Sequence, residues 1–206
     1  MTEARPSHLA VIDRVASFLL GYPDRTVLEG LPEAESALGS LPAWGPRNRL
    51  SEFVARASAT EPSALEIEYV EAFDFRRRSC LYLTYYTDGD TRRRGMALAR
   101  LKRRYREAGL VMEGGELPDY LPAVLEYAAI TGDRGILAEH RPALELLRLA
   151  LEESGSPYAS VVRAVCDTLP GPTPSDRQAV LALAAAGPPS EEVGLDPYPT
   201  SGPGPP

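Results

Sequence analysis

The chain has 206 residues, 44% of them hydrophobic, and carries a formal net charge of −7 with a pI near 5.0. This length allows one well-buried core and is too short for two ordinary domains. Because no apolar run approaches the roughly 18 residues that span a bilayer, and because the N-terminal residues lack the basic start of a secretory signal, we expect a cytosolic protein without direct membrane insertion.

Apolar residues recur at helical spacing from the start of the chain. The first predicted helix covers residues 8–21, with Ser7 as N-cap and an apolar stripe at three- and four-residue steps, namely Leu9, Ile12, Val15, Ala16 and Leu19. A second helix is predicted over residues 24–39, with an interruption near Pro32. Such stripes are typical of amphipathic helices that pack on a common core.

Two further helices follow, over residues 45–59 and from Pro62 onward. Proline is favoured in the first turn of a helix, which places the second start. In that helix Leu65, Tyr69 and Phe73 repeat every four residues, so one face should be buried.

The segment CLYLTYYT, residues 80–87, has the composition of a strand, since it is short and rich in Tyr and Thr. A lone strand leaves its backbone hydrogen bonds without a partner, and no other segment alternates well enough to pair with it. We therefore predict a short helix or an irregular stretch packed against helices.

A basic helix is predicted over residues 91–108, with Asp90 as its N-cap. Arg94 lies in line with the apolar face of this helix, so it should bury its stem and needs an acidic partner. We assign Arg94, Asp90 and Asp74 to the scaffold, with an arginine–carboxylate pair holding the loop before the helix. The apolar face consists of Ala97, Leu98, Leu101, Tyr105 and Ala108.

Four helices complete the chain. ELPDYLPAVLEYAA predicts a helix over residues 120–130, with Asp119 as a suitable N-cap. The next helix begins near Pro142, the one after it is capped by Ser156, and the last covers residues 175–187. Their inner faces are predicted to be Leu121, Val124, Leu125 and Ala128, then Leu144, Leu147 and Leu151, then Val161, Val165 and Leu169.

The predicted fold is a single all-α domain over residues 6–186, a helical bundle of about eight to nine helices. The remaining residues, 187–206, are dominated by Pro and Gly and show no periodicity. We expect them to form a disordered tail.

Sequence signatures of enzymes and metal sites are missing. Cys80 and Cys166 lie far apart without a CxxC or Cys/His spacing, which indicates neither a disulfide framework nor a zinc site. His8 and His140 lack the neighbour that would orient a catalytic imidazole. There is also no phosphate-binding glycine loop, GxSxG elbow or HExxH pair. The sequence favours a protein that is not an enzyme and has no catalytic or metal-binding residues.

Half of the positive charge is gathered into one stretch. Between Arg76 and Arg106 there are ten Arg, one Lys and two Asp, a local charge of +9, so the remainder carries −16. Tyr82, Tyr85 and Tyr86 lie within the stretch and could stack on nucleic acid bases. The acidic chain as a whole repels polyanions, however, and a basic helix face paired with the acidic remainder is the favoured interpretation.

Two blocks, YVEAFDFRRRSCLYLTYYTDGDTRRRGMALARLKRRYREAG (69–109) and ELPDYLPAVLEYAA (116–129), resemble the NarJ family of nitrate reductase molybdenum cofactor assembly chaperones, which is related to TorD and DmsD. The resemblance is most specific in the FD…LYLTYY…GDTRRRGMAL block and in ELPDYLP, and extends more loosely to about Leu169. It implies a TorD/NarJ-like helical bundle and a dedicated cytosolic chaperone that is not part of the final enzyme.

The resemblance also implies a partner. Members of the family bind the N-terminal tail of the nitrate reductase alpha (catalytic) subunit, hold the apoenzyme open for molybdenum cofactor insertion and delay its attachment to the membrane anchor. For this chain the resemblance implies no stably bound cofactor and no nucleic acid partner. It leaves contact with cofactor-insertion proteins open.

A protein that holds such a tail needs an apolar cleft with polar groups at its rim. Aromatic side chains suit the cleft, and acidic side chains suit the basic residues of a leader-like tail. The candidates are Tyr82, Tyr85, Tyr86, Tyr120 and Leu121 for the cleft, and Asp88, Asp119 and Glu126 for the rim. Other interpretations stay open for Tyr82 as a core residue, Asp119 as a cap and Glu126 as a solvated side chain.

Two alternative functions remain. The basic helix over 92–106 could serve a nucleic-acid-binding or regulatory protein. A related chaperone could serve another molybdoenzyme.

Overall fold

The amphipathic stripes fold into helices that share one core. The computed structural model describes residues 7–75, 77–89, 92–112 and 115–186. Within these ranges the helices are α1 (His8–Leu19), α2 (Arg25–Gly39), α3 (Gly45–Ser58), α4 (Pro62–Phe73), the 3₁₀ helix η1 (Arg77–Ser79), α5 (Leu83–Asp88), α6 (Arg92–Glu107), α7 (Leu121–Thr131), α8 (Gly135–Glu139), α9 (Arg141–Glu153), α10 (Tyr158–Asp167) and α11 (Pro174–Ala186).

The all-α class is confirmed for the described residues, which form no strand and only one isolated β-bridge. The short helix α8 was not predicted, and the segment over residues 80–87 does contain a short helix, α5. The tail predicted over 187–206 and the cap predicted at Asp90 lie outside the described residues.

Two predictions about helix boundaries were wrong. Pro32 does not interrupt α2, because it lies on the exposed side of the helix while Leu31 and Leu38 are buried beneath it. Ser156 does not cap α10. The N-cap is Pro157, and the Ser156 hydroxyl is buried without a hydrogen-bond partner among the described residues.

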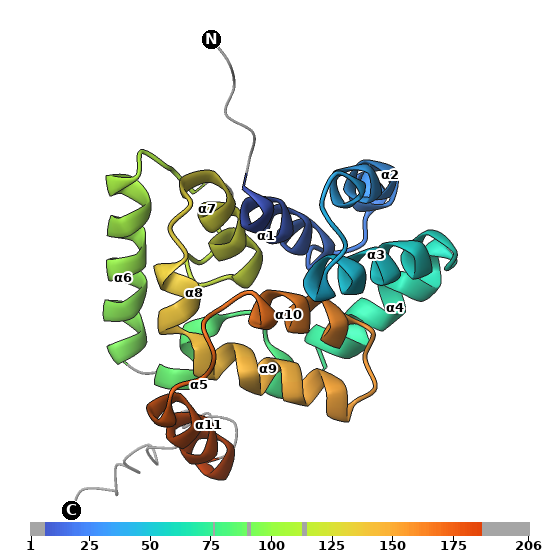
Figure 1. The fold of residues 1–206 in the computed structure, drawn as a ribbon. Coiled ribbons are helices and arrows are strands. Elements are labelled where there is room, and N and C mark those ends of the chain that lie inside the picture. Colours follow the sequence, from blue (N-terminus) through green and yellow to red (C-terminus); the bar gives the residue numbers. More distant parts are fainter. Residues whose placement is uncertain (1–6, 76, 90–91, 113–114, 187–206) are drawn as a thin grey trace, which may run out of the picture.

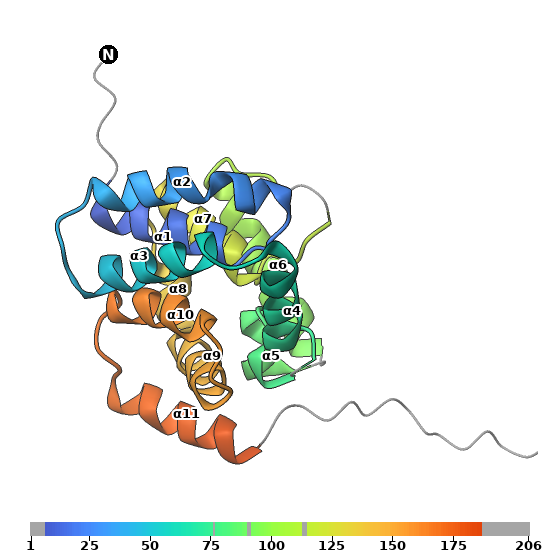
Figure 2. The ribbon, with the colours of Figure 1, turned by 90° about the vertical axis from the view of Figure 1, so that its right-hand side faces the viewer.

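Helix α1 lies at the centre of the bundle (Figure 1). It packs against α7 on one side and against α2, α3 and α10 elsewhere, and α10 packs in turn on α3 and α9. Helix α6 stands at one edge, in contact with α5, whereas α11 lies at another edge against α9 (Figures 1 and 2). None of the helices in the described ranges is long and apolar enough to cross a membrane.

The buried faces of the central helices agree with the predicted stripes except at Leu9, which is 36% exposed in the first turn of α1. Their fully or almost fully buried side chains interdigitate in one hydrophobic cluster, which fixes how the helices cross. The cluster includes Ile12, Val15 and Ala16 of α1, Leu50 and Val54 of α3, Leu121, Val124 and Leu125 of α7, Leu144, Leu147 and Leu151 of α9, and Val161, Val162 and Val165 of α10.

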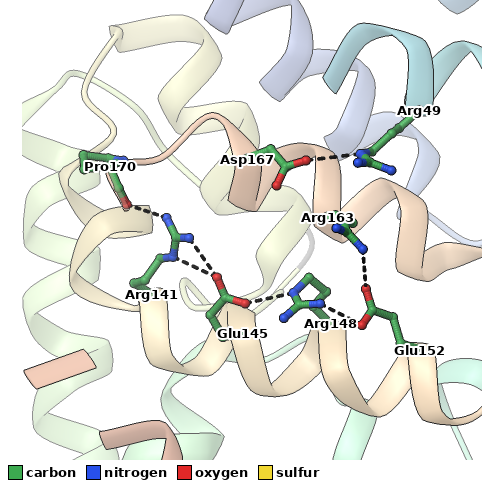
Figure 3. A network of polar contacts seen from close by, with 8 residues as sticks. All are labelled: Arg49, Arg141, Glu145, Arg148, Glu152, Arg163, Asp167 and Pro170. Carbon is green, nitrogen blue, oxygen red and sulfur yellow. Dashed lines mark hydrogen bonds and ion pairs between the residues drawn. The ribbon is translucent and has the colours of Figure 1, made fainter. Parts of the chain in front are cut away.

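A chain of ion pairs runs along α9 (Figure 3). Glu145 lies between two arginines: Arg141 Nη2 donates to its Oε1 at 2.8 Å and Arg148 Nε to its Oε2 at 2.8 Å. Arg148 also donates to Glu152 at 2.7 Å, and Arg163 of α10 reaches the same carboxylate at 3.3 Å. The contact between Arg163 and Glu152 joins α10 to α9.

The pKa of Glu145 should make the fold sensitive to acid. Burial alone would raise this pKa, but the hydrogen bonds and charges of Arg148 and Arg141 lower it below its ordinary value of 4.5. A carboxylate whose folded pKa is lowered stabilises the fold above pH 4.5 and loses that contribution as the pH falls through the folded pKa. Glu145→Gln should therefore lower the free energy of unfolding by about 2 kcal/mol at pH 7.

The difference between wild type and Glu145→Gln should shrink below pH 4.5, as measured by urea unfolding over a pH series. Glu29→Gln is the matched control, because Glu29 forms only an exposed pair with Arg25. An equal loss at neutral and acidic pH would contradict the assignment.

Candidate peptide-binding site

The two sequence blocks that carry the resemblance meet in space. Leu83 N donates to Asp119 O at 3.0 Å, and Leu121 N donates to Leu81 O at 2.8 Å. These two bonds frame an isolated antiparallel bridge between Tyr82 and Tyr120. The segment with strand-like composition thus has one short pairing partner, which satisfies its backbone just before α5 begins.

The carboxylate of Asp119 locks this junction. The residue is 0% exposed, and its Oδ2 accepts hydrogen bonds from the Thr84 backbone N at 3.1 Å and from Thr84 Oγ1 at 2.5 Å. Thr84 is the second residue of α5, so Asp119 caps that helix from a distant part of the chain. Asp119 does not cap α7, where Tyr120 is the N-cap and its side chain makes no capping hydrogen bond.

Arg94 of α6 completes the charge balance. Its Nη2 lies 3.7 Å from Asp119 Oδ2, and its Nε donates to Thr84 Oγ1 at 3.3 Å. The arginine side chain is 16% exposed, so the expected buried stem and acidic partner are both present. Its guanidinium carbon also lies 5.9 Å from the ring centroids of Tyr82 and Tyr85, which fixes both rings by cation–π contact.

Tyr82 and Tyr120 form an aromatic pair at the surface of this junction. Their ring centroids are 5.4 Å apart, and Tyr82 OH donates to Glu116 Oε1 at 3.1 Å. Burial, with the neighbouring Glu116 carboxylate, raises the pKa of Tyr82 to about 12, and burial also raises the pKa of Tyr120. Both phenols therefore stay neutral at physiological pH and can present uncharged aromatic area.

The next two tyrosines point in different directions. The Tyr86 hydroxyl lies within hydrogen-bond distance of the carbonyl oxygens of Arg78 (3.0 Å) and Cys80 (2.9 Å), and its ring packs against the core. Tyr85 is half-buried beside Arg94, with its ring 6.4 Å from that of Tyr86. Tyr86 is therefore a support, whereas Tyr85 remains accessible.

The other predicted site residues are placed outside this surface. Leu121 is fully buried in the core beneath it. Glu126 forms an ion pair with Arg14 of α1. Asp88 lines a cavity of about 450 Å³ with His140 and arginines of α6. Asp74 is the exposed C-cap of α4, and Asp90 lies outside the described residues.

Sequence reasoning missed Thr84 and Glu116. Both stand inside the motif blocks, yet their roles depend on contacts between segments that no local pattern reveals. Among the described residues no cluster of His, Cys, Asp and Glu could hold a metal ion. Burial raises the pKa of the Cys80 thiol, which disfavours a reactive thiolate there.

Comparison with known proteins places the chain. A family model described as nitrate reductase delta subunit matches residues 42–163, which include both motif segments. NarJ of Bacillus subtilis is 33% identical over 156 residues, covering 74% of this chain and 85% of that protein. The chain belongs to the nitrate reductase delta subunit family.

Other members of the family extend the comparison. The nitrate reductase molybdenum cofactor assembly chaperone NarJ of Escherichia coli is 32% identical over 151 residues, 70% of this chain and 64% of that protein. The nitrate reductase-like protein NarX of Mycobacterium tuberculosis is 38% identical over 162 residues. The chain spans only 24% of that protein's length. The resemblance to the NarJ family is thus confirmed.

A solved structure supports the fold. The crystal structure of a protein described as a redox enzyme maturation protein, from Archaeoglobus fulgidus, superimposes with a TM-score of 0.63 and 20% identity, covering 81% of this chain and 96% of that one. The TorD/NarJ-like helical architecture is therefore present in this delta subunit family member.

Removal of the Asp119 carboxylate should loosen the junction. Asp119→Ala should lower the free energy of unfolding by about 3 kcal/mol, because Thr84 and Arg94 would be left without their shared acceptor. Asp119→Asn, which keeps an oxygen for Thr84 but not the charge, should cost about 1–2 kcal/mol. Urea unfolding measures both.

Glu107→Gln is the control, since Glu107 forms only an exposed pair with Arg103. Equal stability of Asp119→Ala and this control would show that the carboxylate does not hold the two segments together.

Proposed function

We propose that the chain is a cytosolic, non-enzymatic chaperone that binds the N-terminal tail of the nitrate reductase alpha subunit. Binding would hold the apoenzyme ready for molybdenum cofactor insertion and complex assembly before membrane attachment. The carrying observation is that the family's most specific blocks in this sequence are the two segments that pair at Tyr82 and Tyr120. Relatives with names of nitrate reductase molybdenum cofactor assembly chaperones give the substrate class.

The geometry suits a peptide ligand. Tyr82, Tyr85 and Tyr120 offer aromatic contact area on side chains with few rotatable bonds, so little entropy is lost on binding. Arg94 holds two of these rings in place, which lowers the cost of ordering them when a tail binds. Glu116 beside them can receive a basic side chain of the tail.

The arginines of α6 offer less support for nucleic acid binding. Arg104 is engaged with Asp133 at 3.0 Å and Glu139 at 2.8 Å, and Arg94 is directed at Asp119. These two positive charges are therefore neutralised within the chain. The proposal keeps a protein tail as the ligand and molybdenum cofactor as the cargo of the partner enzyme.

Calorimetry with a synthetic N-terminal peptide of the alpha subunit tests the function. The wild type should bind it with a negative heat-capacity change, as expected for burial of apolar surface. Tyr85→Ala should weaken binding about tenfold or more, because a central aromatic contact is removed while the supporting Tyr86 stays. Circular dichroism should show unchanged helix content.

Leu181→Ala is the control, because Leu181 is 70% exposed on α11, which packs against α9 at another edge of the bundle. Unchanged affinity of Tyr85→Ala would move the binding surface elsewhere. Tighter binding of a tail from another molybdoenzyme would favour that enzyme as the partner, and salt-sensitive binding of an oligonucleotide in place of either peptide would favour the nucleic acid alternative.

A further inference from the structure

A second polar cavity lies on another part of the bundle. It has a volume of about 290 Å³ and is formed by the end of α3, the middle of α4 and the turn between α9 and α10. Its lining includes Arg56 of α3, Glu68 and Glu71 of α4, and Ser156 of the turn. None of these residues belongs to the aromatic surface described above.

The walls of this cavity carry unused hydrogen-bonding capacity. Arg56 Nη2 and Glu68 Oε1 bond to each other. The second nitrogen of that guanidinium, Nη1, and the second oxygen of that carboxylate, Oε2, are buried without a hydrogen-bond partner among the described residues. So is Ser156 Oγ. Unsatisfied buried polar atoms are rare in native proteins, and here three of them belong to residues that line one cavity.

Few other buried side-chain atoms share this condition. Asp13 Oδ2 and Arg134 Nε have each other as partners, because they form an ion pair at 2.9 Å. Trp44 Nε1 and Asp119 Oδ1 are in other parts of the described chain. The convergence at Arg56, Glu68 and Ser156 therefore marks a place where an occupant would supply the missing partners.

The arrangement defines the chemistry of that occupant. Arg56 Nη1 needs an acceptor, Glu68 Oε2 needs a donor, and the Ser156 hydroxyl can take either role. One arginine and two glutamates give the lining a net charge of −1, which opposes phosphate or a free carboxylate and favours a cation. A lysine side chain would supply the donor and leave Arg56 Nη1 without an acceptor.

We propose that this cavity binds the free amino end of a partner polypeptide. The α-ammonium group would donate to Glu68 Oε2, with Glu71 adding to the favourable field, and the first carbonyl oxygen would accept from Arg56 Nη1. Capture of an N-terminal amine by preorganised polar groups is a known mode of peptide recognition. A volume of about 290 Å³ leaves room for roughly one terminal residue.

The partner is the alpha-subunit tail, so this inference rests on the proposed function. Ile67 of α4, next to Glu68, is 60% exposed, and Phe75, two residues past the end of the helix, is 78% exposed. Ile67 and Glu71 are four residues apart and share a face of α4. From Phe75 the chain leads through η1 to the segment at Tyr82, so these exposed apolar side chains lie between the cavity residues of α4 and the aromatic surface along the sequence.

The decisive experiment compares two forms of the same alpha-subunit peptide, one with a free amino end and one acetylated there. Calorimetry should give about tenfold weaker binding for the acetylated form, because acetylation removes the charge and two donors. Glu68→Gln should weaken the free peptide to a similar extent and leave the acetylated peptide unchanged, so the two changes should not add.

Ser156→Ala provides a second variant in case Glu68→Gln disturbs the pair with Arg56. If its hydroxyl accepts from the ammonium group beside Glu68, this change should weaken the free peptide about threefold without affecting the acetylated one. Glu29→Gln, on the exposed face of α2, is the control and should change neither affinity. Thermal unfolding of each variant verifies that the fold is retained.

A small probe tests the cavity independently of nitrate reductase. Leucinamide, which has an ammonium group beside a carbonyl, should shift the backbone NMR signals of Ala72 and Gly155 in the wild type and not in Glu68→Gln. If both peptides bind equally, the cavity assignment is overturned and the chaperone function stands. If neither peptide binds, the proposed function fails, and leucinamide alone tests the cavity. NMR shifts with leucinamide would then support the ammonium site. Their absence would mean that the cavity holds ordered water only, and would overturn the ammonium site.

Discussion

The buried carboxylate of Asp119 is the interaction on which the rest of the aromatic surface depends. A charge at 0% exposure must be compensated, and here Thr84 supplies two hydrogen bonds while Arg94 supplies the positive charge. Thr84 belongs to α5, Arg94 to α6 and Asp119 to the loop before α7. Because α5 is too short to be stable alone, the cap from Asp119 and the bridge at Tyr82 are what give it a fixed position.

The same logic explains why an acidic chain gathers its arginines in one helix. Helix α6 stands at the edge of the bundle and is attached by ion pairs as well as by its apolar stripe. Arg104 binds Asp133, which also accepts from the Tyr127 hydroxyl at 3.0 Å, while the rings of Tyr105 and Tyr127 pack at 4.9 Å. The positive stretch thus pairs in part with carboxylates that follow it along the chain. Its Arg94 also positions the rings of Tyr82 and Tyr85.

Helical periodicity was sufficient to predict most of the fold, because each stripe reports which face loses water. The inner residues of α7, α9 and α10 were predicted correctly for this reason. Contacts across the chain were not predictable: Asp119 had the pattern of a local cap and instead serves Thr84, and Glu126 meets Arg14 of α1. Ser156 failed as a cap because the turn before α10 directs its hydroxyl inward, a consequence of tertiary packing.

The two polar regions differ in how many of their groups are satisfied: among the described side chains, one buried atom at the aromatic surface, Asp119 Oδ1, lacks a hydrogen-bond partner, against three at the cavity. This difference suits different tasks. At the aromatic surface, Tyr82 and Arg94 are already held by partners within the chain, so this surface is rigid before any ligand arrives. In the cavity at Arg56 and Glu68, one donor and one acceptor have no partner within the described residues. Binding there is favourable only for a ligand that supplies both missing partners. Aromatic area alone would let a tail bind in several registers. A polar anchor for one chain end selects a single direction, and specificity then follows from the cost of leaving those atoms unpaired.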